Sequence, residues 1–71
     1  MKVKDILDLL PENQETQIHC ENYGYYSSYP IGILNMGERV QNASVTKIKI
    51  DYIEHCKCTV IKLYTDLRMA K

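Results

Sequence analysis

The chain has 71 residues, with nine basic and nine acidic side chains and a formal net charge of zero. A chain of this length forms a single domain, here residues 1–71, and buries only about 60% of its unfolded surface, which argues against a deep substrate pocket closed by a lid. The balanced charge lacks the basic excess typical of general nucleic-acid binders and leaves open only a local basic face.

The amino-terminal stretch MKVKDILDLLPEN carries Asp5 and Asp8 and has no long apolar core. It therefore has the features of neither a secretory signal nor a membrane span. The chain contains three cysteines, and an odd number cannot form a closed set of disulfides. We expect a cytoplasmic protein with free thiols.

Apolar residues near the start of the chain repeat with helical spacing, at Val3, Ile6, Leu7 and Leu10. This spacing predicts a short amphipathic helix that ends at Pro11. Because about two turns of helix are not stable alone in water, this helix must pack on the rest of the domain.

The middle of the chain predicts short extended segments. Residues 16–21 have the alternation of a strand, and the β-favouring tyrosines of residues 23–29 predict an edge strand or a strand that runs into a loop. Pro30 and Gly32 then interrupt the regular structure, and the apolar residues around them add to the core. Residues 37–44 are polar and indicate a connection with one helical turn.

The last third of the chain predicts an antiparallel hairpin, because residues 44–53 and 57–65 both alternate between apolar and polar side chains. One face of the first strand consists of Thr46, Ile48, Ile50 and Tyr52. The predicted fold class is α+β, with one short N-terminal helix packed on a three- to four-stranded antiparallel sheet that ends in this hairpin. Residues 66–71 are expected to form a frayed helical turn. The sheet face opposite the helix is expected to be open and to display Lys47, Lys49, Val60, Lys62 and Tyr64.

Four of the six tyrosines fall within seven positions, at Tyr23, Tyr25, Tyr26 and Tyr29, and the chain has no Phe and no Trp. Tyr offers a large contact area at a low cost in side-chain entropy and suits a surface that is apolar on one side and wet on the other. Alternation sends Tyr25 and Tyr26 to opposite sides, so packing all four rings inside the domain is difficult. We interpret the segment as a partner-binding surface, with partial packing of the rings on the sheet as the alternative. A homodimer would use the same property.

A second set of residues favours a different function. Lys47, Lys49, Lys62 and Tyr64 combine cations with an aromatic ring on the expected open face, which is typical of modules that bind single-stranded nucleic acid or nucleotides. The alternative is a solvated lysine face that protects the sheet against edge-to-edge association.

Histidines and cysteines lie close together twice in the sequence, at His19 and Cys20 and at His55, Cys56 and Cys58. Zinc sites use four such ligands, usually with two to four residues between paired cysteines, whereas only one residue separates Cys56 from Cys58. A zinc-stapled structural module stays open beside free thiols and surface histidines. Adjacent strand residues point to opposite faces, so a Cys-His catalytic pair is not favoured, and we expect neither an enzyme nor a cofactor.

The opening VKDILDLLPENQETQIHC resembles the start of small proteins encoded by phages and prophages of Gram-positive bacteria, which begin with a V-K-(D/E)-(I/L)-(I/L) helix, a polar turn and a strand. Residues 45–50 and 59–64 resemble the hairpin that ends those proteins, and residues 22–42 have no counterpart. The resemblance implies a small α+β protein without catalytic residues that acts in the cytoplasm of the bacterial host cell. Some such proteins are anti-CRISPR or other anti-defence inhibitors.

These observations lead to one hypothesis. The chain is a non-enzymatic, phage-type interaction protein that binds and inhibits a bacterial host protein through its tyrosine-rich segment. Because the chain is neutral, the contact is expected to depend on shape and aromatic side chains instead of DNA mimicry.

Overall fold

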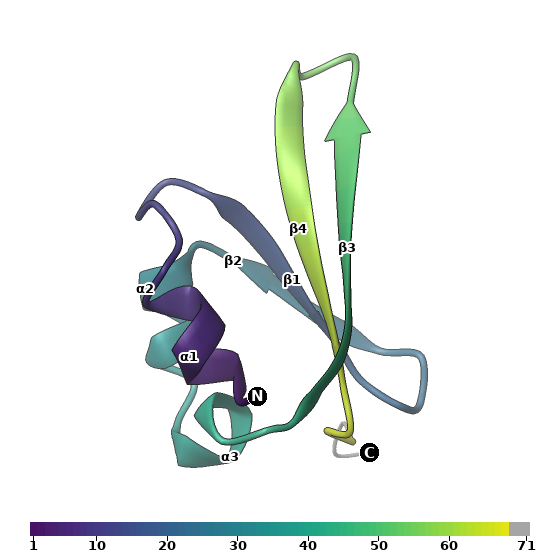
Figure 1. Ribbon diagram of the computed structural model, residues 1–71. Coiled ribbons are helices and arrows are strands. Elements are labelled where there is room, and N and C mark those ends of the chain that lie inside the picture. The colour runs from purple at the N-terminus through teal and green to yellow at the C-terminus, as the bar shows by residue number, and fades with distance from the viewer. Residues whose placement is uncertain (69–71) are drawn as a thin grey trace.

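A computed structural model describes residues 1–68 and has the predicted α+β class, with short helices packed on a four-stranded sheet (Figure 1). The elements in chain order are α1 (Val3–Leu7), β1 (Glu15–His19), β2 (Tyr25–Ser28), α2 (Pro30–Leu34), α3 (Glu38–Gln41), β3 (Val45–Ile53) and β4 (Cys58–Thr65). The predicted strand, tyrosine-rich strand and hairpin are therefore all present.

The sheet is mixed, and the prediction of a purely antiparallel sheet is wrong. Its strand order is β2-β1-β4-β3, in which β1 pairs with β4 in parallel and the two outer pairs are antiparallel. The reason lies in the connections, because parallel neighbours need a long crossover. Here β2, α2, α3 and β3 all lie between β1 and β4 along the chain.

Within residues 1–68, three short helices cover one face of the sheet, where the sequence predicted one helix and a single helical turn (Figure 1). Pro30 does not break regular structure but begins α2, since proline is well suited to the first position of a helix. Gly32 lets α2 approach β2 closely, because a Cβ atom at this position would collide with the side chain of Ser28.

The first helix is shorter than predicted and ends at Leu7. The backbone N–H groups of Leu9 and Leu10 donate to carbonyls three residues earlier, at 3.0 and 3.2 Å, so the chain tightens after the helix. This agrees with the restriction that Pro11 places on the residue before it. Leu10 still packs against the core, whereas Leu9 is exposed.

The core lies between the helices and the two central strands. Val3, Ile18, Ile33 and Leu63 are fully buried, and each comes from a different element of the fold. Ile18 and Leu63 are register partners of the parallel pair, so this pairing places the two central apolar side chains next to each other under the helices.

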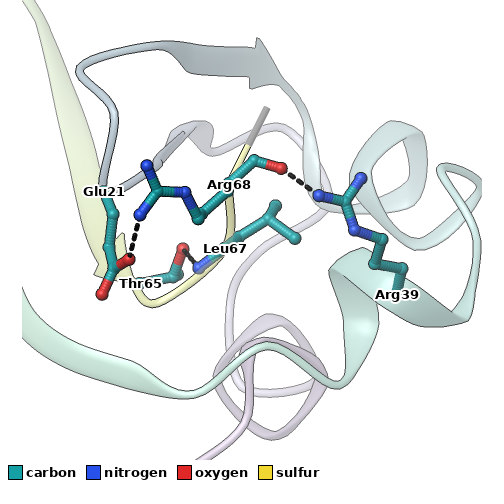
Figure 2. Close-up of polar contacts among 5 residues, drawn as sticks. All are labelled: Glu21, Arg39, Thr65, Leu67 and Arg68. Carbon is teal, nitrogen blue, oxygen red and sulfur yellow. Dashed lines mark hydrogen bonds and ion pairs between the residues drawn. The ribbon is translucent and has the colours of Figure 1, made fainter. Parts of the chain in front are cut away.

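The chain after β4 folds back onto the domain, as Figure 2 shows. Leu67 is buried, and its N–H donates to the Thr65 hydroxyl at 3.1 Å. The guanidinium of Arg68 forms an ion pair with Glu21 at 3.4 Å, and the carbonyl of Arg68 accepts a hydrogen bond from Arg39. The predicted helical turn is not present in residues 66–68, and its remaining residues 69–71 lie outside the described part of the chain.

The hairpin side chains lie on the predicted faces, but two sets of them differ in burial from what was expected. The apolar residues Ile48, Ile50 and Tyr52 are exposed, because the hairpin extends beyond the helical layer (Figure 1). Val60 lies on the open face, as predicted and in line with its register partner Asp51, but its side chain is buried. It is a small side chain on a central strand, between its register partners Glu15 and Asp51.

The position of Ile18 yields a stability test. Ile18→Val removes one methylene group from a fully buried site and should lower the free energy of unfolding by about 1 kcal/mol. Leu9→Ala removes more atoms from an exposed site and should change it by less than about 0.5 kcal/mol. Urea denaturation of both variants measures the difference, and a larger loss for Leu9→Ala would contradict the burial pattern.

Candidate functional site

A row of four side chains crosses the open face of the sheet, one from each strand: Tyr25, His19, Tyr64 and Lys47. They are successive register partners in the order β2, β1, β4, β3. The His19 ring lies 5.1 Å from the Tyr25 ring and 4.7 Å from the Tyr64 ring, and both pairs are stacked. The Lys47 ammonium lies 5.5 Å from the centre of the Tyr64 ring. The row is therefore a continuous aromatic stack that ends in a cation.

The rings of this row stack across the strands with their faces toward one another. Their centroid distances match the spacing of about 4.8 Å between neighbouring strands, and the ring planes differ by only 20° and 22°. Both faces of His19 are occupied by tyrosines, and the second face of Tyr64 is occupied by Lys47. The row thus presents ring edges to the outside, and among these rings only Tyr25, on an edge strand, has an outer face without a partner in the row.

His19 is held in this stack by polar contacts as well. Its Nε2 atom lies 2.8 Å from Oε1 of Gln17, two residues away on the same face of β1. Burial, together with the positive charge of Lys62, lowers the pKa of His19 below its usual value. The neutral imidazole is therefore the form that the folded row favours.

The lysines beside the row are largely paired. The Lys62 ammonium forms an ion pair with Asp51 at 2.6 Å, and Lys49 lies 4.0 Å from the same carboxylate. The hydrogen bond from Lys62 lowers the pKa of Asp51. With Lys47 over the Tyr64 ring, each of the three lysines of the predicted nucleic-acid face already has a partner within the domain.

Residues of the tyrosine-rich segment and of the predicted nucleic-acid face, which lie far apart in the sequence, lie side by side on this face. Tyr25 from the tyrosine-rich segment and Tyr64 with Lys47 from the predicted lysine face stack on opposite sides of His19. Sequence reasoning considered His19 only as a metal ligand or a base. The missing information was the register of β1 on β4, which no local pattern specifies.

The other three tyrosines of the segment take different environments. Tyr23 is 99% exposed in the turn before β2 and has a positive φ of 69°. Tyr29 is half exposed at the start of α2. Tyr26 packs against the core and lines a shallow hollow of about 320 Å³. Thus Tyr26 is packed against the core, whereas Tyr23, Tyr25 and Tyr29 are accessible to a partner.

The histidines and cysteines do not assemble into a metal site within residues 1–68, where no three metal-ligating side chains come together. Cys20 is buried, whereas Cys56 is exposed in the hairpin. A hydrogen bond with Cys56, with further contributions from burial and from Glu15, raises the pKa of Cys58 to about 11. Cys58 is thus a weak source of the thiolate that nucleophilic or metal chemistry requires.

In comparisons with known proteins, no family model, curated protein or solved structure matches the chain. In the described residues 1–68, no helix has the length and apolar character needed to cross a membrane.

The lowered pKa of His19 makes stability depend on pH. As the pH falls below about 6.5, the unfolded chain takes up a proton at His19 more readily than the folded chain does, so the free energy of unfolding should decrease. Denaturation between about pH 8 and pH 5.5 measures this decrease, a range chosen to avoid most carboxylate titration. His19→Gln should remove part of this decrease. Equal pH profiles for wild type and His19→Gln would contradict the partly buried position of His19 beside Lys62.

Proposed function

We propose that the protein is a non-enzymatic interaction protein that binds another protein through the open sheet face around Tyr25, His19 and Tyr64. The observation that carries the proposal is the aromatic row on the open face, in which Tyr25 is exposed and His19 and Tyr64 are partly buried. Tyr25 is 53% exposed although it stacks on His19, so its ring and hydroxyl remain accessible. Tyrosine held in a fixed orientation is enriched at the energetic centres of protein interfaces.

The stacking of the row favours a protein partner over nucleic acid. A protein that binds single strands offers free ring faces on which bases stack, and a charged groove for the phosphates. Here the faces of His19 and Tyr64 are occupied, and Asp51 pairs with Lys62 and Lys49. Ring edges and hydroxyls suit the hydrogen-bonding and apolar groups of a protein surface.

The sequence resemblance supports the biological setting of the proposal. Small phage proteins without enzymatic motifs commonly act by covering a surface of a bacterial protein. We therefore propose a bacterial host protein as the partner and inhibition of that protein as the outcome, as for anti-CRISPR and other anti-defence inhibitors. Tyr23 and Tyr29, both accessible, extend the proposed contact beyond the row.

Binding to a partner tests the role of Tyr25. The tagged protein is used to isolate a partner from a Gram-positive bacterial lysate, and affinity is then measured with the purified partner. Tyr25→Ala should weaken binding by about 30-fold, the effect expected of a central interface residue. The thermal midpoint should change little, because Tyr25 lies on an edge strand and is half exposed.

Ile31→Ala is the matched control, since Ile31 is 66% exposed but lies on α2, in the helical layer. It should bind as wild type does. Equal affinities for wild type and Tyr25→Ala would argue against the proposed surface. Tight binding of a fluorescent single-stranded oligonucleotide that weakens steeply with salt would instead support the nucleic-acid function.

A further inference from the structure

The outer strand β3 carries a second unusual surface, on the face that the helices only partly cover. Ile48, Ile50 and Tyr52 alternate along it and are 48%, 65% and 62% exposed. Contiguous exposed apolar side chains are uncommon on monomeric proteins and usually indicate a contact surface. This surface lies on the opposite side of the sheet from the Tyr25–His19–Tyr64 row, so the proposed function does not account for it.

The same strand is an edge of the sheet, with nine residues and a partner on one side only. Its outward backbone N–H and C=O groups are therefore available for a further strand. The opposite edge, β2, has only four residues, and α2 packs beside it. Of the two edges, β3 thus offers the longer backbone ladder and the apolar side chains next to it.

The sequence of β3 is complementary to itself when two copies run antiparallel with Ile50 on the two-fold axis. Ile48 of one copy then faces Tyr52 of the other, and the two Ile50 side chains face each other. On the other side of the sheet, Lys49 of each copy faces Asp51 of the second copy. Opposite charges in directly paired positions stabilise a sheet, and apolar pairs do the same on the other face.

A neighbouring register is less favourable. With Lys49 on the axis, the two Lys49 ammonium groups would face each other, and like charges in paired positions are destabilising. With Ile50 on the axis, each Asp51 instead lies between Lys62 of its own copy, at 2.6 Å, and Lys49 of the second copy. In the register centred on Lys49, Lys47 would face Asp51, but Tyr52 would face the polar Thr46. The register centred on Ile50 combines Lys49–Asp51 pairs on one face with only apolar pairs on the other, and it therefore favours a second copy as the occupant.

We infer that the protein forms a symmetric homodimer in which two β3 strands pair antiparallel about Ile50. The pairing joins two four-stranded sheets into one continuous sheet and buries the apolar side chains of both copies in one cluster at the axis. It leaves the open-face row of each copy accessible on the other side. The dimer does not depend on the proposed partner.

Sedimentation equilibrium over a range of concentrations tests the dimer. Wild type should approach twice the monomer mass, and Ile50→Lys should stay monomeric because it places two ammonium groups at the axis. Ile31→Lys introduces the same charge at a site of nearly equal exposure, 66% against 65%, and should remain dimeric. A monomeric wild type, or a dimeric Ile50→Lys variant, would overturn the inference. Circular dichroism verifies that each variant is folded.

Disulfide crosslinking tests the register, in a background where Cys56 and Cys58 are replaced by serine and Cys20 stays buried. Ile50→Cys should form a covalent dimer on mild oxidation, since residues directly opposite across the axis have Cβ atoms about 4.5–5.5 Å apart. Lys49→Cys should crosslink far less, because its counterpart in the second copy is Asp51. More efficient crosslinking through Lys49→Cys would exclude the register centred on Ile50.

Discussion

The parallel pairing of β1 with β4 is the contact on which the rest of the structure depends. It brings together two segments more than forty residues apart in the chain, and it fixes both faces of the sheet at once. On the helical face it sets Ile18 beside Leu63 in the core. On the open face the next pair sets His19 beside Tyr64. If β1 shifted by one residue relative to β4, the apolar side chains of β1 would point to the open face, and His19 would no longer stack on Tyr64.

The surfaces of this small domain therefore differ in which side chains they present. The helical layer hides the apolar side chains that the two central strands provide, and the open face holds a self-stacked row of rings with paired charges beside it. The hairpin extends past the helices and leaves an apolar strip on β3 (Figure 1). A domain of this size has a limited core, so burying that strip against a second copy would add to its stability.

Much of the fold can be predicted from local sequence patterns. The features that these patterns do not predict all depend on contacts between distant segments. Alternation located the strands, and apolar spacing located the first helix. The parallel pairing, the extent of the helical layer and the stack on His19 depend on contacts between distant segments, which periodicity does not encode. Pro30 shows the ambiguity at a single residue, because proline both ends and begins regular structure and only its position in α2 decides between them. The sequence predicts one group of tyrosines. Their division into accessible rings and the half-buried Tyr26 follows from the turn before β2 and the packing of α3.

The most direct measurement of the central claim is an NMR experiment that records nuclear Overhauser effects from the ring protons of His19. If β1 pairs antiparallel with β2 and parallel with β4 in the registers described, these protons should show contacts to the rings of both Tyr25 and Tyr64. Contacts to only one of the two tyrosines, or to neither, would contradict the pairing and with it the proposed binding surface.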